Sequence, residues 1–119
     1  MKLDHFNIRE FDSPDKPGSG GLMQPSTLTL LDDARGIAGV PFKITSGYRT
    51  RRHNQDVGGV EDSAHRNGYA VDIHVPDSRT RWKILDALIK VGFNRIGIAD
   101  TFIHVDNDPT KPENVIWTY

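Results

Sequence analysis

The chain has 119 residues, of which 36% are hydrophobic and 26% are charged. This composition excludes a disordered chain and predicts a single globular domain spanning residues 1–119. The formal net charge is -1, so the basic surplus typical of nucleic-acid-binding proteins is absent, and we expect no nucleic-acid partner. There is no cysteine, so any bound metal would be held by His, Asp or Glu side chains.

Residues 1–25 are expected to form an N-terminal arm and loop. Scattered apolar residues in 1–11 suit a docking arm or a short strand, and the segment 12–21 (DSPDKPGSGG) has the composition of a loop. The first residues contain no apolar core segment, and no apolar run approaches membrane-spanning length. We therefore expect neither a signal peptide nor insertion into a membrane.

A helix is predicted over residues 26–39, because apolar side chains recur there at three-residue steps. Ser26 or Thr27 is its expected N-cap. A short strand is predicted at 42–45. Residues 50–62 are polar and rich in glycine, which predicts a loop, or a short helix followed by a loop.

The clearest helical pattern lies in residues 78–93 (SRTRWKILDALIKVGF), where the apolar residues follow a helical period. Asp77 or Ser78 is the expected cap of this helix. Its aromatic residues Trp82 and Phe93 are expected in the hydrophobic core. Three further strands are predicted in the segments YAVDIHV, RIGIA and FIHVDND, with a turn near Asp100. The end of the chain is expected to be an extended segment that covers the sheet.

Together these elements predict an α+β protein, in which two principal helices pack on a small, mainly antiparallel sheet. Side chains alternate between the two faces of a strand. Asp72 and His74 therefore share one face of their strand, and His104 lies on the polar face of another. If these two strands pair in antiparallel fashion, Asp72 and His104 become neighbours. His65 can fold back over Asp72 because Gly68 permits a tight turn between them, and His74 is a competing ligand.

Two histidines and one aspartate suit Zn²⁺, because they supply three nitrogen and oxygen ligands and leave a fourth position for water. Such a set leaves a net positive charge, which lowers the pKa of a bound water molecule. The alternative is a solvated strand face without a metal, and the spacing of one His and one Asp does not separate these interpretations.

Three blocks of sequence resemble the peptidase M15 family: SGYRTRRHN (46–54), VGGVEDSAHRNGYAVDI (57–73) and RIGIADTFIHVD (95–106). The family comprises zinc D-alanyl-D-alanine carboxypeptidases and related murein peptidases, including phage endolysins that cut L-alanyl-D-glutamate bonds. Its core signature, S-x-H-x-x-G-x-A-x-D, is matched by Ser63, His65, Gly68, Ala70 and Asp72.

The resemblance implies a hedgehog/DD-peptidase-like fold and a Zn²⁺ cofactor bound by His65, Asp72 and His104. It implies that Arg49 acts in catalysis, because a guanidinium can orient the substrate and stabilise a developing oxyanion. Ser63 is an expected substrate-binding residue close to the metal. Surface Arg and loop-capping Ser are the alternative interpretations of these last two residues.

One position departs from the family pattern. Many members place a carboxylate, the general base, three residues before the last His ligand, and that position is Thr101 in this chain. Asp100 is the best candidate for the base, and Asp106 is the second candidate. Asp106 could instead orient a metal ligand.

The implied activity is hydrolysis of peptidoglycan stem peptides, as a carboxypeptidase or an endopeptidase. Thr101 favours the alternative, a non-catalytic zinc-containing module that binds the cell wall or has a structural role. We expect a monomer, made in the cytoplasm, that acts on the cell wall after release during phage or prophage lysis, or as part of a phage particle.

Overall fold

A five-stranded mixed sheet organises the computed structural model, which describes residues 2–119. The strands lie in the order β1-β2-β4-β3-β5. Three neighbouring pairs are antiparallel, and β3 and β5 are parallel. The sheet is therefore mainly antiparallel, and the α+β class is confirmed. The strand bounds are β1 Ile44–Ser46, β2 Ala70–His74, β3 Arg95–Ile98, β4 Phe102–Asp106 and β5 Val115–Thr118.

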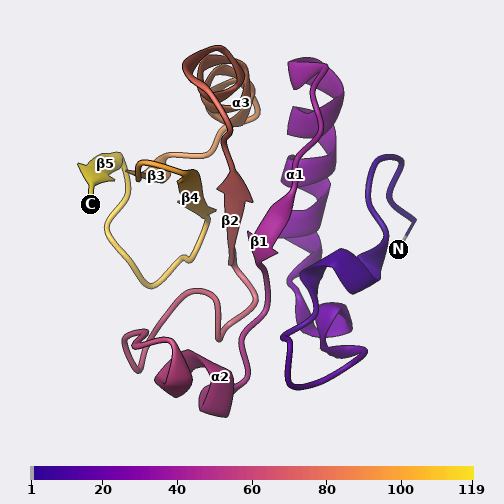
Figure 1. Cartoon of the computed structure of the whole chain (residues 1–119), viewed down its shortest axis with the longest axis vertical. Helices are drawn as coiled ribbons and strands as arrows, with labels where there is room; N and C mark the ends of the chain where they lie inside the picture. The colour runs from indigo at the N-terminus through magenta and orange to yellow at the C-terminus, as the bar shows by residue number, and fades with distance from the viewer. Residues whose placement is uncertain (1) are drawn as a thin grey trace.

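Two longer helices, α1 (Pro25–Ala38) and α3 (Ser78–Lys90), pack against each other beside the sheet. The short helix α2 (Arg51–Asp56) lies at the opposite end of the sheet from α3 (Figure 1). Two 3-10 helices, η1 (Ile8–Phe11) and η2 (Ser19–Leu22), precede α1. No helix within residues 2–119 is long and apolar enough to cross a membrane.

The hydrophobic core forms where one face of the sheet meets α1 and α3. Alternation along β2 and β4 directs every second side chain to this face, as predicted from the sequence. Each fully buried aliphatic side chain contributes about 1.5–3 kcal/mol, so this face fixes the strand register. The principal core residues are Val71, Ile73 and Val75 from the β2 region, Ile103 and Val105 from β4, Leu28 and Leu31 from α1, and Ile84 and Leu88 from α3.

The helix starts were predicted with mixed success. Helix α1 begins at Pro25, so the expected N-cap at Ser26 or Thr27 is wrong, because both residues lie within the first turn. Proline is favoured at this first position because its φ is already helical and its missing N–H has no partner there. The cap of α3 is confirmed: Asp77 accepts a hydrogen bond from the Thr80 amide at 2.7 Å.

Two further expectations are corrected. Trp82 is 65% exposed rather than in the core, because it lies on the side of α3 opposite Ile84; Phe93 is buried as expected. The final segment does not merely cover the sheet, because residues 115–118 pair with β3 and form its edge strand.

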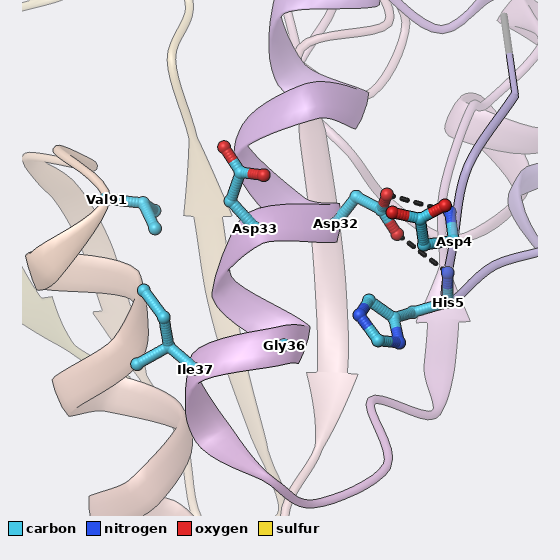
Figure 2. A pocket seen from close by; sticks show the side chains of 7 residues that line it. All are labelled: Asp4, His5, Asp32, Asp33, Gly36, Ile37 and Val91. Carbon is cyan, nitrogen blue, oxygen red and sulfur yellow. Dashed lines mark hydrogen bonds between the residues drawn. The ribbon is translucent and has the colours of Figure 1, made fainter.

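The start of the N-terminal arm is fastened to α1. Figure 2 shows the Asp32 carboxylate accepting hydrogen bonds from the backbone amides of Asp4 and His5, at 2.8 and 2.9 Å. These groups border a surface hollow of about 440 Å³ that reaches Ile37 and Val91. The hollow belongs to the helical layer, so it lies away from the polar face of β2 and β4.

Candidate metal centre

The structure brings His65, Asp72 and His104 together on the sheet face opposite the core. One ligand atom from each residue lies within 4.8 Å of the others. Asp72 of β2 pairs directly with His104 of β4, which confirms the expected antiparallel arrangement. His65 precedes β2 and reaches Asp72 through a turn at Gly68, whose φ of +80° favours glycine.

The spacing of these donor atoms fits zinc. Asp72 Oδ1 is 3.3 Å from His65 Nε2 and 3.1 Å from His104 Nδ1. Two donors at zinc-ligand distance in a tetrahedral site are separated by about 3.3 Å. The three side chains are also buried, with exposures of 3%, 8% and 8%. Buried, converging donors of this type suit a metal ion and are not the solvated strand face of the alternative interpretation.

The ring of His65 is oriented by the backbone. Its Nδ1 lies 2.9 Å from the carbonyl oxygen of Gly47, so Nδ1–H donates to this oxygen and Nε2 keeps its lone pair toward Asp72. A β-carbon at position 47 would lie 2.7 Å from backbone atoms of Phe11. Glycine is therefore required for the carbonyl to approach His65 while Phe11 stays in the core.

The ring of His104 is oriented by a buried ion pair. Its Nε2 lies 2.7 Å from Asp106 Oδ2, and the other oxygen of Asp106 lies 2.7 Å from Arg95 Nε. This contact leaves Nδ1 of His104 for Asp72 and for a metal. Carboxylates commonly orient metal-binding histidines in this way. Asp106 therefore holds His104, which was the second of the two roles considered for it.

Arg95 was not identified from the sequence, although a signal existed. Gly97 pairs with His104 across the β3–β4 ladder, and Arg95 lies two residues earlier on the same strand. Side chains two residues apart share a face, so a predicted β3–β4 hairpin register would have placed Arg95 beside Asp106.

The electrostatics of the cluster follow from burial and these contacts. Burial opposes the charge on Asp72, but hydrogen bonds from His104 and His65 outweigh it and hold the pKa of Asp72 below its ordinary value. Burial lowers the pKa of His65, and its contacts with Asp72 offset this only in part. For His104, burial is outweighed by hydrogen bonds to Asp106 and Asp72, so its pKa is raised.

Arg49 lies beside the cluster. Its Nη2 is 3.5 Å from Asp72 Oδ2. The guanidinium is also held by Ser46 Oγ at 3.0 Å and by Asn54 Oδ1 at 3.3 Å. Burial lowers the pKa of Arg49, and the Asp72 carboxylate opposes this shift. Asn54 is 2% exposed and binds the Val60 carbonyl, so it fixes the guanidinium and the following loop together.

Of the other candidate residues, Ser63 lies next to the donor cluster, whereas His74 and Asp100 lie outside it. Ser63 is buried, and its hydroxyl accepts a hydrogen bond from the His65 amide at 3.2 Å. His74 pairs with Phe102 at the far end of β2 and is not in the donor cluster. Asp100 is exposed in the β3–β4 turn, where its backbone oxygen accepts a hydrogen bond from Arg81. The structure does not bring Asp100 into the donor cluster.

An aromatic side chain closes one side of the cluster. The ring centroid of Trp117 from β5 lies 5.4 Å from that of His104, and the Arg95 guanidinium lies 5.3 Å from the Trp117 ring. Gly97 makes room for this ring, because a β-carbon there would lie 2.5 Å from Trp117 Nε1. No pattern in the sequence gave a strand pairing that would place Trp117 here.

These features define an α+β domain with three donors that could hold a metal ion, supported by an orienting carboxylate and an adjacent arginine. The family model described as Peptidase M15 matches residues 4–106. No curated protein matches the chain. The match covers the donor cluster and most of the fold, so the chain belongs to the peptidase M15 family, a family of peptidases.

Proposed function

We propose that the chain is a zinc-dependent peptidase that hydrolyses peptide bonds in peptidoglycan stem peptides, as a carboxypeptidase or an endopeptidase. The observation that supports it most is the convergence of His65, Asp72 and His104 within 4.8 Å in a member of the peptidase M15 family. Family membership supports the peptidase reaction, and the donor set supports the metal. The stem-peptide substrate comes from the resemblance of the sequence blocks.

The residues present fit zinc better than a hard cation. Two imidazole nitrogens and one carboxylate are typical zinc donors, whereas Mg²⁺ and Ca²⁺ favour oxygen ligands. Zinc in such a set acts as a Lewis acid toward a carbonyl oxygen and lowers the pKa of a water molecule in its open position. His65 and His104 each have their second ring nitrogen bound, so both rings are held before any metal arrives.

Arg49 is the group best placed to act on the substrate. Its guanidinium is held by Ser46 and Asn54 beside Asp72, so no reorganisation is needed when a substrate binds. A fixed, partly buried cation is effective at stabilising an oxygen that gains negative charge in the transition state. We propose that Arg49 orients the scissile carbonyl and stabilises this charge.

We propose Asp100, which is adjacent in sequence to the family position of the base at Thr101, as the group that takes the proton of the attacking water and later delivers it to the leaving amine, although it lies outside the donor cluster in this structure. Asp106 is unsuited to this step because both of its oxygens are already bound, one by His104 and one by Arg95. Within residues 2–119, the carboxylates hydrogen-bonded to the two histidines are Asp72 and Asp106. Substitution of Asp100 therefore tests this assignment directly.

The alternative function is a zinc-containing module without turnover. Thr101 at the position where many relatives carry the base favours it, as does the commitment of Asp106 to His104. In that case the metal site would bind zinc and the cleft would bind cell-wall peptides, but no bond would be cut. The two functions share the metal site and differ in one measurable outcome.

The test is incubation of the purified protein with defined stem peptides, followed by mass spectrometry, with added zinc or with a chelator. Loss of one D-alanine identifies a carboxypeptidase, and a new internal amine identifies an endopeptidase. Asp100→Ala should slow cleavage, whereas Asp86→Ala on α3 is the matched control and should not. Zinc binding without any cleavage would overturn the peptidase proposal in favour of the module. Full activity in Asp100→Ala would overturn the assignment of the base alone.

A further inference from the structure

A small hollow lies beside His104, on the side of the loop that precedes His65. Its volume is about 170 Å³, and its wall includes Val60, Ser63, Ala64 and Lys111 together with His104. Because His104 is one of the proposed zinc ligands, a molecule in this hollow would lie next to the reacting bond. The wall also includes the ion pair of Arg95 and Asp106, so the hollow combines two cations, one carboxylate, one hydroxyl and two small apolar side chains.

We propose that this hollow binds a free carboxylate on the substrate residue that follows the scissile bond, with Lys111 as its counter-ion. The inference rests on the proposed peptidase function and specifies which substrates that function accepts. It assigns substrate recognition to Lys111, which lies outside the segment that the family model matches.

The charges around the hollow make Lys111 the available cation. Arg95 also lines the hollow, but its guanidinium is bound by Asp106 and by the Pro112 carbonyl. Asp106 is neutralised by the same contact and by His104. The Arg95–Asp106 pair therefore adds little net charge, and these two contacts use only two of the five N–H donors of the guanidinium. Lys111 supplies the net positive charge of the hollow.

Lys111 is only weakly paired. Its side chain is 18% exposed, and its Nζ lies 3.4 Å from Asp62, whose side chain is 84% exposed. A pair with such an exposed partner contributes little, because water screens it. A lysine ammonium has three N–H donors, so Lys111 can bind a second carboxylate while Asp62 stays in place or swings into solvent.

Ser63 and the apolar wall complete the fit. The Ser63 oxygen accepts a hydrogen bond from the His65 amide, so its hydroxyl proton can be donated to a carboxylate oxygen. Val60 and Ala64 offer apolar surface for a methyl group or a short side chain. Lys111, Ser63 and the apolar wall together suit a small substrate residue after the scissile bond that carries a carboxylate next to its amine. They disfavour a long uncharged peptide at this position.

Two residues of peptidoglycan stems have this chemistry. A terminal D-alanine carries a free carboxylate beside the amine released by a carboxypeptidase. A D-glutamate joined through its side chain carries one beside the amine released by cleavage of an L-alanyl-D-glutamate bond. The hollow could bind the carboxylate of the D-alanine or that of the D-glutamate. Which of the two peptides is cleaved shows which residue it accepts.

The test compares peptides that differ only in this carboxylate. Stem peptides with the free acid and with the corresponding amide, for each of the two residues, are assayed with the zinc-loaded wild type, Lys111→Met and Lys111→Arg. Lys90→Met, which removes a lysine from the surface of α3, is the matched control. Thermal denaturation verifies that each variant is folded.

The wild type should cleave the preferred free acid with a KM about 10- to 100-fold lower than that of its amide, the range expected for a hydrogen bond to a charged group. Lys111→Met should raise KM for the acid by a similar factor and should not distinguish acid from amide. Lys111→Arg should restore most of the preference. An unchanged preference for the acid in Lys111→Met would overturn the inference.

A binding experiment separates this inference from the peptidase proposal. The affinity of the same acids and amides for the zinc-loaded proteins is measured by calorimetry. If no peptide is cleaved but the wild type binds the acid more tightly than Lys111→Met does, the carboxylate site stands and the peptidase proposal fails. If wild type and Lys111→Met bind acid and amide alike, the carboxylate site is refuted even when peptides are cleaved.

Discussion

Replacement of Asp106 by Asn tests whether this carboxylate holds His104 for a metal. Asp106 is 1% exposed, and its two oxygens contact His104 Nε2 and Arg95 Nε, each at 2.7 Å. Asparagine keeps the volume of the side chain and one acceptor oxygen. It removes the negative charge and turns an amide N–H₂ toward either His104 or Arg95, both of which are donors at these contacts.

The expected loss can be worked out from these contacts. Removal of an orienting partner of a metal-binding histidine lowers metal affinity about 10- to 100-fold, or about 1.4–2.7 kcal/mol. The buried Arg95 charge also loses its partner, and breaking a buried pair costs about 3–5 kcal/mol of folding stability. Arg95 retains the Pro112 carbonyl and the Trp117 ring, so we expect the lower end of this range.

The assay is competition between the protein and a chelator of known zinc affinity, together with chemical denaturation of the metal-free protein. Asp86→Asn, which changes an acid on the surface of α3, is the control. Zinc affinity in Asp106→Asn within about twofold of the wild type would refute the orienting role of Asp106. If affinity were kept but hydrolysis were abolished, Asp106 rather than Asp100 would be the better candidate for the base.

Three other predictions follow from single contacts. Arg49→Lys should lower kcat about 10²- to 10³-fold with little change in zinc affinity, because the fixed guanidinium is lost but the donor set is kept; an unchanged kcat in peptide hydrolysis would contradict its role. Gly97→Ala should destabilise the fold by about 1–3 kcal/mol in chemical denaturation, because the new β-carbon overlaps Trp117; a wild-type midpoint would contradict the packing. The Thr80 amide lowers the pKa of Asp77, so its stabilisation of α3 is present above about pH 4 and is lost as pH falls through the lowered pKa. Thermal denaturation of Asp77→Asn should therefore show less acid destabilisation than the wild type, and identical pH profiles would contradict this.

The donor cluster was predictable because the strand period and the resemblance to the family signature together specify its residues. Alternation along two strands places Asp72 and His104 on one face, and their antiparallel pairing makes them neighbours. The motif spacing and Gly68 then place His65. The strand period supplies the shared face of Asp72 and His104, whereas the choice of His65 over His74 came from the resemblance to the family signature.

The support around the cluster was harder to predict because it depends on pairing between distant segments. Asp106 could be placed on the face of His104, but its role depends on Arg95 of the neighbouring strand. Trp117 reaches the site only because β5 pairs with β3 in parallel after a long connection. No local pattern in the sequence specifies that pairing.

Trp82 shows a different reason for failure. Its size and hydrophobicity favoured the core, but its position on α3 directs it away from the sheet. The helical period carries more information than the hydrophobicity of one side chain.

The central claim is that His65, Asp72 and His104 form a zinc site that drives peptide hydrolysis. The most direct measurement is the rate of stem-peptide cleavage by metal-free protein as zinc is added in known ratios to the chain. We predict no cleavage without metal, a maximum near one zinc per chain, and no recovery in His104→Ala, while His53→Ala behaves as the wild type. Cleavage that is independent of zinc, or a full rate in His104→Ala, would contradict the account.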